Sequence, residues 1–161
     1  MASQCRFCTF YLDYLWFGIA VERVYEVIRS PDITRVPLAA RAVAGLINLR
    51  GQIITVIDLR ARLGFEQPPD GTLPAAVVAR SEDATVGLLV DEIGEVVEAL
   101  ETTYEIAPDN LLAESRELVP GVYKLPNRLL HALDLDKVVG GDIREEAQSG
   151  KDLKERRYFD D

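Results

Sequence analysis

Apolar residues along this chain come in short runs, many with two-residue alternation, and turns rich in Gly, Pro, Asn and Asp separate the runs at near-regular spacing. Such a series predicts an all-β sandwich or barrel. Two stretches are more mixed: Glu22–Arg29 predicts a short turn that leads into a strand, and Thr102–Glu117 a loop with a helical turn. The predicted strands are Arg6–Leu12, Leu15–Val21, Ala42–Leu49, Gln52–Ile57, Ala75–Arg80, Thr85–Val90, Glu92–Leu100, Val119–Lys124 and Arg128–Leu133.

The second half of this pattern repeats the first. Gly45–Gly64 aligns with Gly121–Gly140, and Phe17–Glu22 aligns with Val86–Asp91, in the same order along the chain. Any two apolar strands can look alike, but the aligned Gly and Asp positions favour a true repeat. An offset of roughly 70 residues is typical of supersecondary units or small subdomains. The repeat therefore predicts two small barrels packed side by side, joined through the Pro-rich stretch 67–74.

Each repeat contains an apolar hairpin with different turn residues. The first turn is Asn48–Gly51, where Gly51 tolerates a positive φ, and the second is Lys124–Asn127, where Pro precedes Asn. Arg50 at the first tip has no packing role to explain it, and guanidinium suits multidentate contacts with a partner's carboxylates or carbonyls. A plain solvated turn is the alternative. Two strands of these hairpins are apolar at nearly every position, which predicts burial on both faces: Ile53–Ile57 and Leu129–Leu133.

A short helix is predicted directly after the first hairpin. Asp58 is suited to accept hydrogen bonds from the first amides of a helix over Leu59–Leu63, and Gly64 follows where a left-handed residue would end it. Asp134 and Gly140 bracket the second copy in the same way. We therefore interpret both aspartates as helix caps rather than catalytic groups.

Length and charge limit the classes of function. A chain of 161 residues suits one domain or two small ones that share a core, and its net charge is −9. An acidic balance opposes binding to nucleic acid and to anionic membranes. The sequence has no apolar run near the roughly 18 residues of a membrane span, and its N-terminus lacks the layout of a signal peptide. The expectation is a cytoplasmic protein without direct membrane insertion.

Residues that carry chemistry are few. Cys5 and Cys8 form a C-x-x-C, but a strand points them to opposite faces, so two ordinary thiols are the preferred interpretation. His131, the single histidine, lies mid-strand and is interpreted as packed and hydrogen-bonded. The chain has no nucleophile elbow, phosphate loop or zinc-protease motif. No catalytic, cofactor or metal residue is predicted, although a small β-barrel enzyme and a nucleic-acid-binding barrel stay as alternatives.

Gly45–Gly51, followed by Ile57–Arg60, resembles the signature of the CheW family of bacterial chemosensory adaptors. The resemblance runs from about Phe7 to Val139. Further motifs occur in the same order: Val24–Ile28, Thr34–Pro37, Val86–Asp91 and Leu133–Lys137. Several motifs in one order make the resemblance specific, which a lone Asn-Leu-Arg-Gly would not.

The resemblance implies one CheW-like domain over 5–141, built from two pseudo-symmetric five-stranded SH3-like barrels at about 5–70 and 71–141, with short helical turns. A polar tail over 142–161 would follow. It also implies a non-catalytic adaptor without a cofactor. Its partners would be the cytoplasmic signalling tip of chemoreceptors (methyl-accepting chemotaxis proteins) and the regulatory domain of a CheA-type histidine kinase. The output would be chemotaxis or motility, or another chemosensory response.

The resemblance also assigns residues to these contacts. Arg50 matches the receptor-contact arginine of the family, and an amphipathic helical tip of the receptor would lie in an apolar groove between the barrels. A kinase- or array-facing loop matches Pro108, Asp109 and Asn110, with Asn110 in a place where an aromatic is often found. The other residues assigned to receptor binding are Asn48, Gly51, Val24, Glu26 and Ile33.

Overall fold

The computed structural model describes residues 3–37, 39–106, 113–140 and 143. These residues form eleven strands and a few short helices. The strands are β1 (Gln4–Leu12), β2 (Leu15–Ala20), β3 (Val24–Ile28), β4 (Val43–Leu49), β5 (Gln52–Asp58), β6 (Ala75–Arg80), β7 (Thr85–Val90), β8 (Glu92–Leu100), β9 (Tyr104–Ile106), β10 (Gly121–Leu125) and β11 (Arg128–Ala132). The helices are α1 (Leu59–Leu63), α2 (Ala113–Leu118), α3 (Leu135–Val138) and the 3₁₀ turns η1 (Val21–Arg23) and η2 (Glu101–Thr103).

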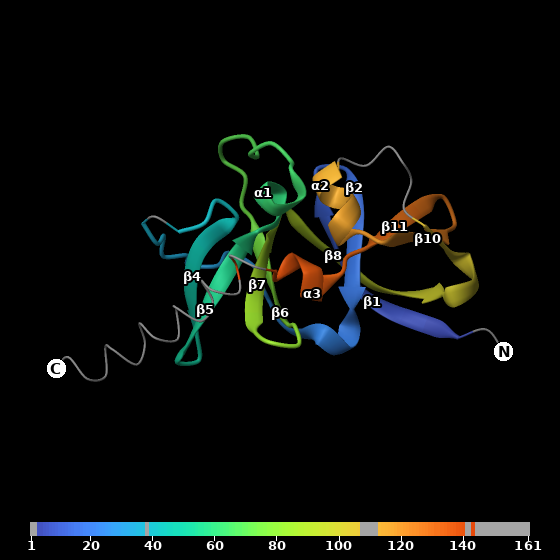
Figure 1. The fold of residues 1–161 in the computed structure, drawn as a ribbon, viewed down its shortest axis with the longest axis horizontal. Coiled ribbons are helices and arrows are strands. Elements are labelled where there is room, and N and C mark those ends of the chain that lie inside the picture. The colour runs from blue at the N-terminus through green and yellow to red at the C-terminus, as the bar shows by residue number, and fades with distance from the viewer. Residues whose placement is uncertain (1–2, 38, 107–112, 141–142, 144–161) are drawn as a thin grey trace.

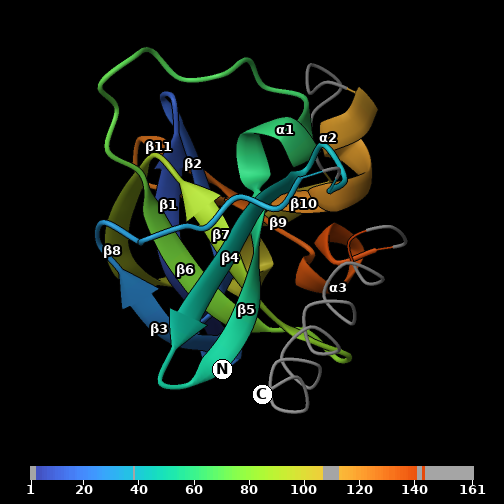
Figure 2. The same cartoon turned by 90° about the vertical axis from the view of Figure 1, so that its left-hand side faces the viewer.

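The strands form two curled sheets that lie side by side (Figure 1). Barrel I is the six-stranded sheet with the order β8-β1-β2-β11-β10-β9. Barrel II is the five-stranded sheet with the order β3-β6-β7-β5-β4, and Figure 2 looks onto it with hairpin β4–β5 towards the viewer. The predicted all-β fold of two small barrels is confirmed. No helix in the part of the chain that the structure describes is long and apolar enough to cross a membrane.

The sequence repeat appears in the strand order as an exchange between the halves. If β1, β2 and β3 are exchanged with β6, β7 and β8, and β4 and β5 with β10 and β11, the order β8-β1-β2-β11-β10 of barrel I becomes the order β3-β6-β7-β5-β4 of barrel II. Parallel pairing of β2 with β11, and of β5 with β7, joins strands of different halves. A boundary near residue 70 thus separates the two repeats but not the two barrels, because β1 and β2 belong to barrel I.

Barrel I has one strand more than the five implied by the resemblance. The extra strand is β9, which pairs with β10 over three residues. Among the described residues, the corresponding edge of barrel II holds one isolated bridge, in which the Thr34 and Leu46 amides each donate to the other's carbonyl oxygen at 2.8 Å. Gly45 lets these chains approach closely, since a Cβ there would lie 2.3 Å from the Thr34 carbonyl oxygen.

The largest apolar core lies between the barrels rather than inside either one. Strands β1, β2, β5, β6 and β7 contribute to this main core, together with all three α-helices. Strand β5 is buried on both faces as predicted: Ile54 and Val56 pack inside barrel II, and Ile57 packs in the main core. In β11 the same prediction holds for the fully buried Leu130 but is wrong for Leu129, which is 43% exposed.

The predicted helix caps are largely correct. Asp58 accepts from the Ala61 amide at 3.3 Å, Asp134 accepts from the Lys137 amide at 3.2 Å, and Gly64 ends α1 with φ +83°. The prediction for Gly140 is wrong, because α3 already ends at Val139 with φ −89°. Arg62 of α1 donates to the last carbonyl oxygens of α3, on Lys137 and Val138, at 2.9 and 3.1 Å. These bonds satisfy the helix end without a left-handed glycine.

The single histidine and the two cysteines have structural environments. His131 is buried, its Nδ1 lies 2.9 Å from the Trp16 carbonyl oxygen, and its ring packs on Phe17. The prediction of a packed histidine is confirmed. Cys5 and Cys8 are free thiols on β1, and burial is the main cause that raises the pKa of each. A raised pKa keeps a thiol protonated and lowers its reactivity.

Each of α1 and α3 is tied across the barrels by a polar cluster. In the α1 clamp, Arg60 donates from Nε to Asp91 at 2.8 Å and from Nη1 to the Glu66 carbonyl oxygen at 2.7 Å, and it also pairs with Asp13. In the α3 clamp, Asp136 accepts from Arg23 at 3.3 Å and from the Glu82 amide at 2.9 Å. Both clamps join a helix of one barrel to the first hairpin turn of the other.

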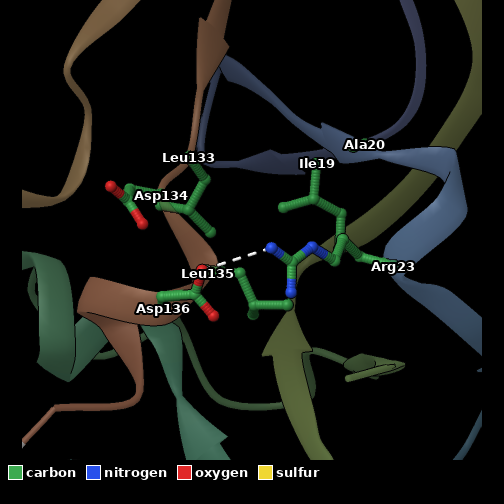
Figure 3. A pocket seen from close by; sticks show the side chains of 7 residues that line it. All are labelled: Ile19, Ala20, Arg23, Leu133, Asp134, Leu135 and Asp136. Atoms are coloured by element: carbon green, nitrogen blue, oxygen red, sulfur yellow. Dashed lines mark hydrogen bonds and ion pairs between the residues drawn. The ribbon is translucent and has the colours of Figure 1, made fainter. Parts of the chain in front are cut away.

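A hollow of about 170 Å³ lies beside the α3 clamp (Figure 3). Arg23 reaches across it from the end of η1 towards Asp136. Ile19 lines one side, and the segment 133–136 lines the other. This hollow lies between the end of β2 and the segment that links β11 to α3. Arg23, which lines it, is the residue directly before β3.

Candidate functional site

The tip of hairpin β4–β5 is a two-residue turn. Leu49 pairs directly with Gln52, which leaves Arg50 and Gly51 as the loop, with φ values of +52° and +83°. Two positive φ values identify a type I′ turn, the loop whose twist matches antiparallel strands. The Asn48 side-chain oxygen accepts from the Gly51 amide at 3.0 Å and braces the turn. The positive φ expected for Gly51 is confirmed.

Arg50 is an unfavourable residue for the backbone conformation it adopts. The first central position of a type I′ turn favours Asn, Asp or Gly. A left-handed conformation costs other L-residues roughly 1–2 kcal/mol. The chain carries this cost at an exposed tip, where no packing requires an arginine. Such a residue is a candidate for function, since backbone strain concentrates at binding sites.

The Arg50 side chain rests on β3. Its Nη2 lies 3.3 Å from Oε1 of Glu26, its Nη1 lies 3.5 Å from the Tyr25 hydroxyl, and its Cζ lies 6.0 Å from the centre of the Tyr25 ring. The side chain is nevertheless 68% exposed. An exposed ion pair contributes little stability, typically about 0–1 kcal/mol. The contacts orient the guanidinium at the surface more than they hold the fold together.

The curl of barrel II brings β3 to the tip of the β4–β5 hairpin. The two elements lie at opposite edges of the flat strand order, so only a curled sheet lets Arg50 meet Glu26. The pairing of β3 with β6 shifts register between Val24 and Glu26, which places Tyr25 in a bulge. Bulges are frequent near binding sites, where they redirect a side chain.

Tyr25 and Val27 belong to this site, although the sequence analysis assigned neither to a contact. Tyr25 is 64% exposed, and Val27 on the same strand is also exposed. The signal was present in the alternation of β3, where Tyr25 and Val27 share a face opposite Val24 and Ile28. Together with Arg50 they form a surface of one cation and two apolar side chains, which we call the β3 face.

The other predicted receptor-contact residues lie in different places. Glu26 and Asn48 belong to the tip, although Oε2 of Glu26 is buried and has no hydrogen-bond partner in the described structure. Val24 packs against the main core, and Ile33 packs against the interior of barrel II. The structure therefore groups Arg50 with Glu26, Asn48 and Gly51, and it places Val24 and Ile33 behind them. Pro108, Asp109 and Asn110 lie outside the described residues.

The chemistry available at this site is recognition. Guanidinium donates to carboxylates and carbonyls in fixed geometry, and aromatic and aliphatic neighbours contribute apolar contact area. Among the described residues, no group of three His, Cys, Asp or Glu side chains could hold a metal ion. The site has the composition of a protein-binding surface, in which arginine and tyrosine are enriched.

Comparisons with known proteins agree with this fold. The family model of the CheW-like domain matches residues 6–142. The chemotaxis protein CheW of Thermotoga maritima is 33% identical over 131 residues, which cover 81% of this chain and 85% of that protein. CheW of Bacillus subtilis is 31% identical over 76% of this chain and 79% of that protein. The crystal structure of scaffolding protein TtCheW from Thermoanaerobacter tengcongensis aligns with a TM-score of 0.77 at 26% identity, over 88% of this chain and 96% of that one.

Proposed function

The chain belongs to the CheW family, and on that premise we propose that it is a chemotaxis adaptor that couples chemoreceptors to a CheA-type histidine kinase. The observation that carries the proposal is the extent of the family match. It spans residues 6–142 and thus both barrels, together with the clamps that fix them to each other. An adaptor needs this complete surface, because it holds two partners at once.

We assign the receptor contact to the β3 face and the adjoining tip. Arg50 would donate to carboxylates or backbone carbonyls of the receptor's cytoplasmic signalling tip, while Tyr25 and Val27 cover its apolar side chains. Asn48 and Gly51 set the turn that presents Arg50. Val24 and Ile33 would support the contact indirectly. Val24 packs β3 against the main core, and Ile33 packs against the interior of barrel II.

The kinase contact is assigned through the family resemblance. The partner would be the regulatory domain of the kinase, and Pro108, Asp109 and Asn110 are the residues we propose for it. The protein would work in the cytoplasm, recruited to membrane-associated receptor arrays. The same scaffold in a chemosensory pathway with another output is the second candidate, and protein PilI of Pseudomonas aeruginosa, 32% identical over 78 residues, is a relative with a different name.

The proposed mechanism needs no bond-making step. An adaptor bound to both receptor and kinase makes their encounter effectively intramolecular, which raises the local concentration of each for the other. A signal passes only if the contacts at the β3 face differ in free energy between the receptor's signalling states. The rigid seam between the barrels would then transmit a change at one barrel to the partner on the other.

The test is a binding measurement on the wild-type protein, Arg50→Glu and the control Arg6→Glu. Arg6 is an exposed arginine on β1 of barrel I, loosely paired with Glu98 at 3.9 Å. Each protein is titrated against a receptor signalling-tip fragment and against the kinase regulatory domain. Wild type and Arg6→Glu should bind both, and Arg50→Glu should bind the receptor fragment at least about tenfold more weakly, the loss of one charge-assisted contact.

The outcomes separate the parts of the proposal. Arg50→Glu should melt at nearly the wild-type temperature, because Arg50 lies on an exposed turn. If that variant unfolds instead, Arg50 is structural and its assignment fails. If wild type binds neither partner, the adaptor function fails while the family fold stands. Binding of both partners without any effect on swimming when the gene is deleted would favour the second candidate.

A further inference from the structure

The tip of hairpin β10–β11 also carries an arginine, but in a different setting. Arg128 directly follows the turn residue Asn127, which has φ +63°. Its Cζ lies only 3.5 Å from the centre of the Trp16 ring and 5.7 Å from that of Tyr11. One of its nitrogens also donates to the Tyr11 hydroxyl. A planar guanidinium stacked on an indole is held in one orientation, with a desolvated face.

This oriented cation has no carboxylate partner in the described part of the chain. The ion pairs found there join Arg6, Arg23, Arg50, Arg60 and Lys124 to acidic side chains, and none involves Arg128. Asp13 and Asp91 both pair with Arg60 instead. In a protein with a net charge of −9, a fixed and unneutralised arginine is a local site of positive charge.

A surface hollow of about 320 Å³ opens beside this arginine. Trp16 and Tyr11 line it, as do Tyr14 and Leu129. Tyr14 is 89% exposed and Leu129 is exposed as well, which is unusual for side chains of this size. Trp, Tyr and Arg in one concave patch are the residue types that dominate binding energy at protein interfaces. Leu129 is also the position at which the predicted two-sided burial of β11 fails.

We propose that this hollow binds an acidic segment of a protein partner. A carboxylate of the segment pairs with the outward edge of the Arg128 guanidinium, and a neighbouring apolar side chain packs among Trp16, Tyr14 and Leu129. The arginine selects the occupant, because a stacked guanidinium binds a carboxylate with charge-assisted hydrogen bonds. This inference does not depend on the proposed function, since no residue of the β3 face takes part in it.

Trp16 gives a direct readout, because it is the single tryptophan of the chain and it lines the hollow. The probe is the blocked tripeptide acetyl-Leu-Asp-Leu-amide, and its uncharged counterpart carries Asn in place of Asp. Tryptophan fluorescence is followed during titration of the wild-type protein, Arg128→Gln and the control Arg6→Gln, a change at an exposed arginine outside the hollow. Melting temperatures of the three proteins verify that each is folded.

The expected result is a saturable fluorescence change with the Asp peptide, weakened at least about tenfold by Arg128→Gln or by the Asp-to-Asn exchange in the peptide. Arg6→Gln should bind like wild type, and added salt should weaken the binding. The proposal is overturned if both peptides bind equally, if Arg6→Gln loses binding as much as Arg128→Gln, or if no change occurs with about 10 mM peptide, where a dissociation constant in the millimolar range would already be visible. An Arg128→Gln protein that fails to fold is replaced by Arg128→Lys, which keeps the charge but loses the planar stack, and binding as tight as wild type would then contradict the role of the stacked guanidinium.

Discussion

The α1 clamp and the α3 clamp occupy equivalent places in the repeat, yet the helix residue at the centre of each has the opposite charge. Arg60 aligns with Asp136, Asp13 aligns with Glu82, and the cation of α1 is replaced by an anion in α3. Their environments also differ: the Arg60 side chain is 7% exposed, whereas that of Arg23, the cation of the α3 clamp, is 40% exposed. In both repeats the helix is linked to the opposite barrel at the same position, but the charge of the linking helix residue is reversed.

This difference predicts unequal energies. A buried charge that loses its partner is left desolvated, so breaking a buried pair typically costs about 3–5 kcal/mol. A half-exposed pair is screened by water and typically contributes about 0–1 kcal/mol. The α1 clamp should therefore be essential for the seam between the barrels, and the α3 clamp should be adjustable. The hollow beside Arg23, visible in Figure 3, agrees with looser packing at that end.

The largest expected effect comes from Arg60→Met. This variant leaves Asp91 partly buried without its cation and should lower the free energy of unfolding by about 3–5 kcal/mol. Urea denaturation measures the loss, and Arg41→Met at an exposed arginine of the same barrel is the control. A loss below about 1 kcal/mol would mean that packing of the methionine stabilises the fold nearly as much as the ion pairs of Arg60 do. The proposed contrast between the clamps would then be wrong.

The second prediction concerns acid. Burial alone would raise the pKa of Asp91, but the hydrogen bonds from Arg60 and the Asp13 amide, with the Arg60 charge, lower it below its usual value. A carboxyl with a lowered pKa stabilises the fold at pH above its unfolded pKa of about 3.9, and the stabilisation is lost as the pH falls through the lowered folded value. Asp91→Asn should therefore be less stable at neutral pH and should lose less stability below about pH 4.

That acid prediction is checked by urea unfolding of wild type and Asp91→Asn at neutral pH and at about pH 3, where the carboxyl of an unfolded chain is mostly protonated. The difference in stability between the two proteins should shrink in acid. A constant difference across this range would show that Asp91 acts through shape rather than through charge.

The third prediction uses the glycines that follow the two helices. Gly64→Ala places a side chain at φ +83° and should destabilise the protein by about 1 kcal/mol. Gly140→Ala should cost less, because α3 ends at Val139 and the new Cβ would only approach the Lys137 carbonyl oxygen at 3.1 Å. Thermal melting of both variants decides this, and an equal loss would show that Gly140 has a backbone role like that of Gly64.

The smallest expected effect is that of Asp136→Asn. The amide oxygen can still accept from the Glu82 amide, so only the exposed pair with Arg23 is lost, and the loss should stay below about 1 kcal/mol. Differential melting against wild type measures it. A loss comparable with that of Arg60→Met would show that the two clamps contribute equally to stability despite their different exposure.

Local features of the fold followed from the sequence because they depend on neighbouring residues. Most of the strands, the positive φ at Gly51 and the caps at Asp58 and Asp134 are set within a few positions of each residue. The strand β9, by contrast, lies in the stretch 102–117, for which a loop with a helical turn was predicted. The exchange of strands was not predictable in this way, since an alignment of repeats gives equivalence but not pairing. The clamps could not be predicted for a related reason. Arg60 and Asp136 are aligned but have opposite charges, so the sequence repeat does not indicate that they have equivalent roles.

At the candidate site, the sequence predicts the turn, its arginine and the neighbours Glu26 and Asn48, but not Tyr25. Tyr25 comes close to Arg50 only because barrel II curls and β3 bulges. Gly140 was assigned a cap that Arg62 supplies from a distant helix. In the second hairpin, Arg128 lies one position after the turn, and its position over Trp16 depends on a residue far away in the sequence. In each case a long-range contact decided the outcome.

The exchange of strands has a consequence for the order in which the protein can be made. Barrel II is complete once β7 has been synthesised, whereas β1 and β2 lack their barrel until β8, β10 and β11 leave the ribosome. During that interval the first hairpin, with Phe7, Trp16 and Phe17, has no partner strands from its own barrel. Exposed apolar strand edges promote aggregation in nascent chains. The hairpin β1–β2 is thus synthesised well before the strands that pair with it in barrel I.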